Sequence, residues 1–358
     1  MKFGLVTVFA AALLSGALAQ QPNFELSGYA TVGAGTTGGA GGTITNVTTR
    51  DQLLAAVKGH SPKIVYVSGN VGGTTRISVG NNTSIIGVGD SAIVDGGGFS
   101  VNKASNVIIR NLIIRKVVNN DGITVLQSNN VWIDHNEFYS DTEHGFDYYD
   151  GQVDITLGSD YVTVSWNKFH DHYKSSLIGS SEKNGAQDTG HFKITYHHNS
   201  WNNVHTRTPG VFIHGPMARG IHTRSYGQVL VQANVFSNVT EPISTYGFVI
   251  PDDSPIDPEG DYEPDGFANE QSKLMISGLV TEPISTYGFV IPDDSPIDPE
   301  GDYEPDGFAN EQNNLYINSG KNNITQVGNF MSVPYTYQLD APDSVKAIVD
   351  QYSGVGKI

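Results

Sequence analysis

Four short apolar runs of the sequence each end in an asparagine, and these asparagines recur at a nearly constant spacing. Asn136, Asn167, Asn199 and Asn234 are separated by 31, 32 and 35 residues. In each run, large apolar or aromatic side chains stand five and three positions before the asparagine, an alternation that places both on one face of a β-strand. A period of this length suits one coil of a solenoid that is built from several short strands and their turns.

We therefore predict an all-β fold, a right-handed parallel β-helix (solenoid), with long C-terminal loops. Asparagine tolerates left-handed backbone and can hydrogen-bond its own turn, so stacked copies would form a ladder. A β-sandwich has similarly short strands but requires no constant spacing between asparagines. Residues 49–57 are predicted to form a short amphipathic helix, capped by Thr49, which covers the open N-terminal end of the solenoid.

The first residues have the pattern of a secretory signal. Met1, Lys2 and Phe3 precede the apolar run 4–18, which ends in Ala17-Leu18-Ala19 before Gln20. One basic residue, a short apolar run and small residues at positions −3 and −1 predict a signal peptide over residues 1–19. We expect the remainder, residues 20–358, to be a secreted, extracellular chain that forms a single β-helix domain.

Two further features bear on the extracellular expectation. The chain has no cysteine, so its rigidity must come from a large repetitive core, helped by bound metal, rather than from disulfides. Five sequons are compatible with a glycosylated surface. They begin at Asn46, Asn81, Asn82, Asn238 and Asn323.

The net charge of −17 is concentrated in a duplicated segment. Residues 239–271 recur unchanged as 280–312, a block of 33 residues at an offset of 41. Each copy holds nine of the 37 acidic residues and no Lys or Arg, so the rest of the chain carries 19 acidic and 20 basic residues. The Pro, Asp, Glu and Gly content of the duplicated block predicts that it forms a loop. We expect one copy to wrap around the C-terminal end of the solenoid and the other to loop out.

Four motifs occur in order along the chain: VWIDHN at 131–136, DGQVD at 150–154, HDHYKSSLIG at 170–179 and RTP at 207–209. Together they closely resemble polysaccharide lyase family 1, the pectate lyases, and particularly its fungal members. The resemblance extends from about residue 33 to residue 236. It implies a parallel β-helix and the calcium-dependent cleavage of de-esterified polygalacturonate, a (1,4)-α-D-galacturonan, by β-elimination.

Asp121, Asp150 and Asp154 are the candidate metal ligands. Asp150 and Asp154 stand four residues apart at the edge of a strand, and Asp121 lies one coil earlier. Residues one coil apart stack closely in a solenoid, so these carboxylates would repel one another unless a hard cation such as Ca²⁺, which takes oxygen ligands, lay between them. The resemblance implies the same three positions as calcium ligands. Asn119 is a candidate carbonyl donor.

Lys174 and Arg207 are the candidate catalytic residues. Elimination removes the C5 proton of a galacturonate, and Ca²⁺ bound to the adjacent carboxylate would acidify that proton. Lys174 would hold the substrate acid group or stabilise the developing enolate. The resemblance implies that Arg207 is the base. Because an arginine side chain normally keeps its proton up to pH values of about 12, this role predicts an alkaline optimum.

Other polar residues of the motifs are interpreted as structural framework and not as metal ligands. They are Asp134, His135, His170, His172, His197 and His198. The sequence departs from the family pattern in two places. A second Arg expected three residues after the RTP motif is replaced by Phe212, with Arg219 or Arg224 as candidate substitutes. By comparison with the family pattern, about ten residues, roughly one strand, are missing or replaced between Val211 and Arg219.

Three alternatives stay open. A pectin lyase would act on methyl-esterified pectin without calcium, but a neutral substrate would not need the three Asp residues or Lys174. A hydrolase of the polygalacturonase type would need a tight cluster of catalytic carboxylates, and the sequence has no Gly-His-Gly run. A non-catalytic pectate-binding protein would keep the metal and Lys174 with a groove damaged near Phe212. The expected partner is plant cell-wall polygalacturonate; we expect a monomer with no nucleic-acid or membrane partner.

Overall fold

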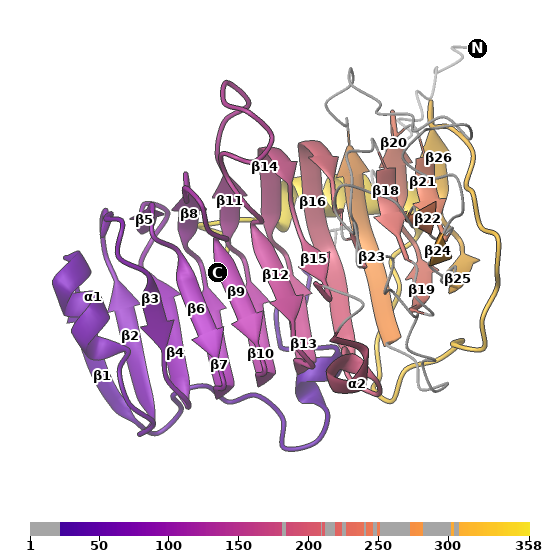
Figure 1. Cartoon of the computed structure of the whole chain (residues 1–358). Coiled ribbons are helices and arrows are strands. Elements are labelled where there is room, and N and C mark those ends of the chain that lie inside the picture. Colours follow the sequence, from indigo (N-terminus) through magenta and orange to yellow (C-terminus); the bar gives the residue numbers. More distant parts are fainter. Residues whose placement is uncertain are drawn as a thin grey trace, which may run out of the picture.

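The two central coils of the chain each run through three short strands, and each strand of the first pairs in parallel with its counterpart in the second (Figure 1). One coil comprises β9 (Ile123–Leu126), β10 (Asn129–Asp134) and β11 (Glu137–Tyr139). The next comprises β12 (Val153–Thr156), β13 (Asp160–Ser165) and β14 (Lys168–Lys174), and all three pairings are parallel. The predicted parallel β-helix is therefore confirmed.

This computed structural model describes residues 22–180, 184–208, 210–211, 219–223, 227–239, 241–245, 249–250, 273–281, 302–303 and 308–358. The predicted signal peptide, Phe212, Arg224, the side chain of Arg219 and most of both acidic copies lie outside this part of the chain. None of the helices within it is long and apolar enough to cross a membrane.

The remaining strands extend the stack on both sides of these two coils. Before them come β1 (Thr43–Val47), β2 (Lys63–Val67), β3 (Ile77–Val79), β4 (Thr83–Gly87), β5 (Ile93–Asp95), β6 (Phe99–Asn102), β7 (Ser105–Arg110) and β8 (Ile113–Arg115). After them come β15 (Leu177–Ile178), β16 (Ile194–Thr206), β17 (Gly210–Val211), β18 (Arg219–His222), β19 (Gln228–Gln232), β20 (Val235–Ser237), β21 (Glu241–Ser244), β23 (Lys273–Thr281), β25 (Phe308–Gln312) and β26 (Leu315–Ile317). A separate antiparallel pair joins β22 (Val249–Ile250) to β24 (Asp302–Tyr303).

The core is a column of stacked apolar side chains inside the coils, as the alternation of the runs predicts. Val131 pairs with Val162, which pairs with Ile194, and all three are fully buried. On the neighbouring strands, the rings of Phe138 and Phe169 stack with centroids 4.9 Å apart. Burial of such a continuous column provides the rigidity that a chain without disulfides requires.

The asparagine ladder forms over three of the four predicted positions. The Oδ1 of Asn167 accepts from the backbone nitrogen of Asn136 at 2.9 Å, and the Oδ1 of Asn199 accepts from that of Asn167 at 3.0 Å. The fourth step differs from the expectation, because Asn234 is hydrogen-bonded to Asn314 and not stacked on Asn199. The reason is that another strand lies between them.

That strand is β23, which lies mostly in the segment between the two acidic copies and ends on the first two residues of the second copy. It pairs in parallel with β16 on one side and with β19 on the other. In the opposite sheet, β17 and β18 are directly paired. The position beside β16, where the family pattern places a strand from the stretch after Val211, is occupied by residues 273–281.

Both acidic copies contribute to the sheets, which differs from the expectation that one whole copy would wrap and the other would loop out. The first copy provides β21, which pairs with β18, and the second provides β25, which pairs with β19. The described ends of the two blocks are therefore strands, whereas the proline-rich and acid-rich middle sections lie outside the described residues.

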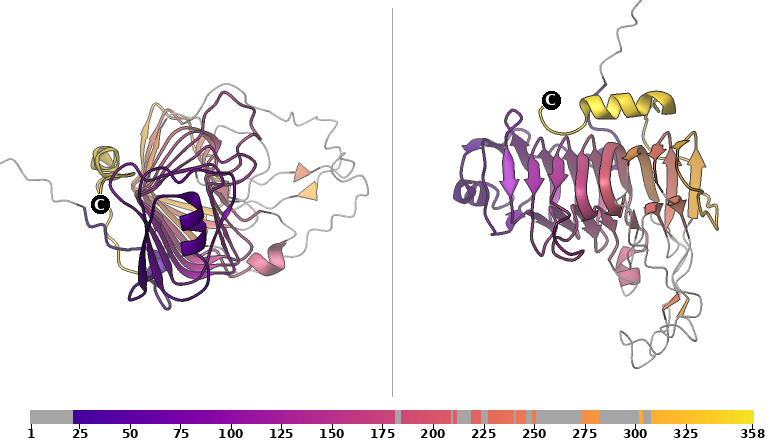
Figure 2. Two further views of the ribbon diagram at one scale, coloured as in Figure 1. Left: turned by 90° about the vertical axis from the view of Figure 1, so that its left-hand side faces the viewer. Right: turned by 90° about the horizontal axis from the view of Figure 1, so that it is seen from above.

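Helices cover one end and one side of the stack (Figure 2). The predicted N-terminal helix is α1 (Arg50–Ala56), with Thr49 capping the backbone nitrogen of Gln52 and Leu53 fully buried. A short helix, α2 (Gly185–Asp188), follows β15. The sequence did not predict α3 (Pro342–Tyr352), which lies along the outside of the coils and buries Val345 and Val349.

The place of β23 predicts a large effect from Ile276→Pro. A proline removes a backbone donor from a strand that is paired on both sides, so we expect the free energy of unfolding to fall by about 3 kcal/mol or more. Chemical denaturation measures this. Val327→Pro in the exposed C-terminal segment is the control, and equal, small effects of both substitutions would contradict the pairing of β23.

Candidate active site

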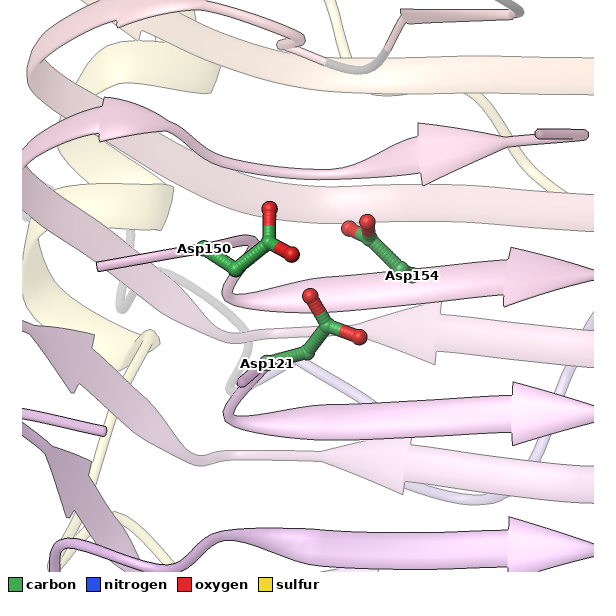
Figure 3. Close-up of side chains that lie close together, drawn as sticks. All are labelled: Asp121, Asp150 and Asp154. Atoms are coloured by element: carbon green, nitrogen blue, oxygen red, sulfur yellow. The ribbon is translucent and has the colours of Figure 1, made fainter. Parts of the chain in front are cut away.

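The three predicted metal ligands lie together at the corner where the chain enters the sheet of β9 and β12. Asp121 precedes β9, Asp150 precedes β12 and Asp154 lies within β12. Asp154 stands beside Thr124 in the parallel register, which brings successive coils together. One carboxylate oxygen from each residue lies within 4.8 Å of the other two, and the three groups face one another (Figure 3).

Backbone and hydroxyl donors fix two of these carboxylates. Asp121 accepts from the backbone nitrogen of Gly151 at 2.9 Å and from the hydroxyl of Thr124 at 2.7 Å. Asp154 accepts from the backbone nitrogen of Leu177 at 3.1 Å. A Cβ atom on Gly151 would lie 2.1 Å from Oδ1 of Asp154, so the glycine of the DGQVD motif leaves the space that this carboxylate occupies.

The close approach is electrostatically costly for the carboxylates themselves. Burial raises the pKa of Asp154 well above its ordinary value, and the charge of Asp121 raises it further. Burial also raises the pKa of Asp121, with Asp150 adding to the effect. Buried carboxylates that lie close to one another tend to bind either a proton or a cation. The side chain of Asp150, in contrast, is 49% exposed and faces solvent at the mouth of the cluster.

Lys174 closes one side of the cluster. Its Nζ lies 3.3 Å from Oδ1 of Asp150 and 2.9 Å from Oδ1 of Asp147. The lysine side chain is only 9% exposed, whereas that of Asp147 is 86% exposed. The ring of Phe146 lies 5.2 Å from the same ammonium. Lys174 is therefore a nearly buried cation whose two acidic partners, Asp147 and Asp150, are both open to solvent, Asp147 more so.

Arg207 closes the other side. It follows β16, and its Nη1 lies 3.6 Å from Oδ2 of Asp154. The Arg207 backbone adopts the left-handed region, with φ of 64°, a conformation that costs a non-glycine residue free energy and is often found at functional sites. The structure thus brings all five predicted site residues into one place; their catalytic and metal-binding roles stay predictions.

The framework residues have partners of their own. Asp134 accepts from Arg110 and Ser165 and contacts His135, in a buried network on β10 and β13. His170 contacts Glu137 and Asp171, and His198 contacts His197 and Asp340. Within the described residues, the one group of three or more His, Asp or Glu side chains that could hold a metal is the cluster of Asp121, Asp150 and Asp154.

His172 is a buried histidine that contacts the backbone of Asp150. Burial lowers its pKa to about 4, so the imidazole is neutral at neutral pH, and its Nε2 donates to the backbone carbonyl of Asp150 at 2.5 Å. Asn119 has a left-handed backbone, and its nitrogen donates to the carbonyl of Tyr148. Its role as a further metal ligand stays a prediction.

Sequence reasoning missed several residues of the site. Asp147 stands only three positions before Asp150, in the run Asp147-Tyr148-Tyr149-Asp150, and this proximity was an available signal. No comparable signal in the sequence pointed to Thr124 or Arg76 as residues of the site. Arg76 reaches the cluster from two coils away, and the register steps from Ile77 to Phe99 and Ile123 are irregular in length.

The donor set fits a hard divalent cation. Three carboxylates converge, no nitrogen or sulfur ligand lies among them, and Gly151 leaves room for the most buried one. Oxygen-only sites of this charge suit Ca²⁺ or Mg²⁺. Fold and site together define a parallel β-helix protein with a cluster of three carboxylates that could hold a metal ion, flanked by one lysine and one arginine.

Comparison with known proteins places this arrangement in a family. A family model described as pectate lyase matches residues 1–250. Pectate lyase A of Aspergillus niger is 45% identical over 222 residues, which cover 58% of this chain and 68% of the relative. Probable pectate lyase A of Neosartorya fischeri is 43% identical over 227 residues, covering 60% and 71%. The chain belongs to the pectate lyase family, as the four motifs predicted.

Solved structures agree. A pectate lyase from Bacillus sp. N165, determined in complex with trigalacturonate, superimposes with a TM-score of 0.68 at 30% identity and covers 93% of this chain and 99% of its own. The predicted enzyme class, a polysaccharide lyase of the pectate lyase type, is thereby confirmed.

Asp154→Asn tests the cluster without an activity assay. A carboxylate whose pKa is raised by folding adds stability below its ordinary pKa and loses it as the pH rises through the raised value. In chelator, wild type should therefore lose stability as the pH rises from the ordinary pKa of an aspartate through the raised pKa of Asp154, and the isosteric Asn variant should lose less. Calcium at about 100 times its Kd should add about 2.7 kcal/mol to wild type and much less to the variant.

Thermal melts with chelator and with calcium measure both effects. Asp90→Asn, which replaces an exposed carboxylate elsewhere, is the matched control. Equal calcium stabilisation of wild type and Asp154→Asn would remove Asp154 from the metal site.

Proposed function

We propose that the protein is a secreted, calcium-dependent pectate lyase. Its substrate would be (1,4)-α-D-galacturonan, the de-esterified pectin of plant cell walls, and its products 4,5-unsaturated oligogalacturonides. The observation that carries the proposal is the position of Asp121, Asp150 and Asp154 between two cations, Lys174 and Arg207. A polyanionic sugar needs cations for its carboxylates, and a cluster of three carboxylates beside them needs a metal.

The chain's own residues would bind and deprotonate the sugar. Asp121, Asp150 and Asp154 would hold calcium, which when bound draws charge from the C6 carboxylate and acidifies the C5 proton. Lys174 would bind the carboxylate and stabilise the charge that develops on it. Arg207, after losing its own proton to solvent at alkaline pH, would take the C5 proton, the role that the family resemblance gives it. The C5–H electrons then form the C4–C5 double bond, and the oxygen at C4 leaves and takes a proton from solvent.

A methyl-esterified substrate fits this site less well. Esterification removes the charge that Lys174 and a bound cation would recognise, and it leaves the three carboxylates without a function. This supports pectate over esterified pectin as the substrate. The non-catalytic alternative is separated by the assay below, because a binding protein would retain oligogalacturonate without turning it over.

Arg207→Ala should reduce turnover of polygalacturonate by about 100-fold or more, the usual contribution of a positioned acid–base group. The ultraviolet absorbance of the unsaturated product measures the rate, at alkaline pH, with calcium and then with chelator. Arg115→Ala, which removes a surface arginine paired with Asp95, should keep wild-type activity. Retained turnover in Arg207→Ala, or wild-type turnover in chelator on esterified pectin, would contradict the proposal.

Asp147 offers a second test, because it occupies the position that a substrate carboxylate would take on Lys174. Asp147→Asn should lower the KM for polygalacturonate by about two- to fivefold, the value of one exposed ion pair, with kcat nearly unchanged. Glu143→Gln is the control, since Glu143 is exposed in the same connection. A raised KM in Asp147→Asn would show that Asp147 helps to bind the substrate and does not compete with it.

The same proposal includes the processing of the chain. We infer that residues 1–19 are removed as a signal peptide and that residues 20–358 form one domain. Asn46 and Asn323 are exposed sequon positions and suit N-glycans. Asn82, in contrast, donates to the carbonyl of His60 and accepts from Asn106 within the turns, so its amide is already used. Mass determination of the secreted protein tests both points.

A further inference from the structure

Arg76 lies under the acidic cluster although it belongs to a coil two turns away. It immediately precedes β3, and the register Ile77–Phe99–Ile123 aligns it with Gly98 and Gly122. Its guanidinium donates to the backbone carbonyl of Asp121, to the hydroxyl of Thr124 and to the carbonyl of Gly97. The side chain therefore runs along the stack toward the candidate metal ligands.

Gly98 makes this path available. Its φ is +56°, and a Cβ at that position would lie 2.6 Å from Nη1 of Arg76. Any other residue in the intervening coil would fill the space through which the arginine passes. The arrangement of Arg76, Gly98 and Asp121 thus depends on three consecutive coils.

The arginine is coupled to the cluster by charge and by one hydroxyl. Thr124 accepts from Arg76 and donates to Oδ2 of Asp121 at 2.7 Å. Burial lowers the pKa of Arg76, while the charges of Asp121, Asp154 and Asp150 act in the opposite direction. The guanidinium is therefore a partly buried cation whose donors point to the protein, in contrast to Lys174 with its exposed partner Asp147.

The charges around the cluster give this cation a role. Three acidic side chains, Asp121, Asp150 and Asp154, lie beside three basic ones, Lys174, Arg207 and Arg76. A fourth acidic side chain, Asp147, shares Lys174 with Asp150. Lys174 and Arg207 are the cations that the proposed mechanism directs to the substrate. Arg76 is the one that remains with the carboxylates whether or not substrate is bound.

We propose that Arg76 is a built-in counter-cation of the metal centre, which holds the three carboxylates together before calcium binds and thereby sets the calcium affinity. This inference rests on the proposed calcium site. A fixed positive charge beside the site repels a second cation, and the repulsion is strong where the surroundings are partly buried. Arg76 is thus a positioning residue whose charge opposes calcium binding while it stabilises the metal-free fold.

Arg76→Gln removes the charge and keeps an amide donor, and Thr124 can still donate to Asp121. Calorimetric titration with calcium should show that the variant binds calcium about tenfold more tightly than wild type does. The gain reflects the loss of one charge–charge repulsion near the protein surface. In chelator, the melting temperature of Arg76→Gln should fall, and saturating calcium should restore most of the loss. Arg76→Lys, which keeps the charge, should remain near wild type in both measurements.

The outcomes separate the two proposals. If wild type binds no calcium, both the calcium site and the role of Arg76 are wrong. If wild type binds calcium but Arg76→Gln binds it equally or more weakly, or loses the same stability with and without calcium, Arg76 is a structural residue only. A variant that folds only in calcium would support the counter-cation, because calcium would then replace the missing charge.

Discussion

The parallel register of the coils is the constraint on which the rest of the structure depends. Hydrogen-bonded strands lie about 4.8 Å apart, so residues at equivalent positions of successive coils are forced into contact whatever their charge. The pairing of β9 with β12 places Asp154 beside Thr124, and the backbone nitrogen of Gly122 donates to the carbonyl of Gly151. The acidic cluster follows from this ladder, because side chains one coil apart cannot move away from each other without breaking backbone hydrogen bonds.

Electrostatics then decides what else the site must contain. Burial of several carboxylates is unfavourable unless they are hydrogen-bonded and paired with cations. Gly151, Thr124 and Leu177 donate to them, and Lys174 and Arg207 approach from two sides. The groups that pair the carboxylates are thus the same types of group that a uronic acid chain requires. This charge arrangement is the one that the proposed binding of an anionic polymer together with a divalent ion would require.

Local repetition is what made the fold and much of the site predictable. The asparagine spacing predicted the coil, Thr49 predicted the start of the capping helix, and the DGQVD motif with Asp121 predicted the acidic cluster. The rest depended on information that a period does not carry. Asn234 pairs with Asn314 because a remote strand separates it from Asn199, and α3 packs on the outer surface of the stack. Arg76 acts across two coils of unequal length, which no local motif records.

The position of β23 connects the acidic duplication to the active site. β16 ends at Thr206, and the next residue, Arg207, has a left-handed backbone, a conformation that the surrounding structure must hold in place. With β23 in place, β16 is paired with β13 and β14 on one side and with β23 on the other. Without it, the strand that positions Arg207 would become an edge strand. The segment between the duplicated blocks therefore contributes to the site by pairing with the strand that leads into Arg207.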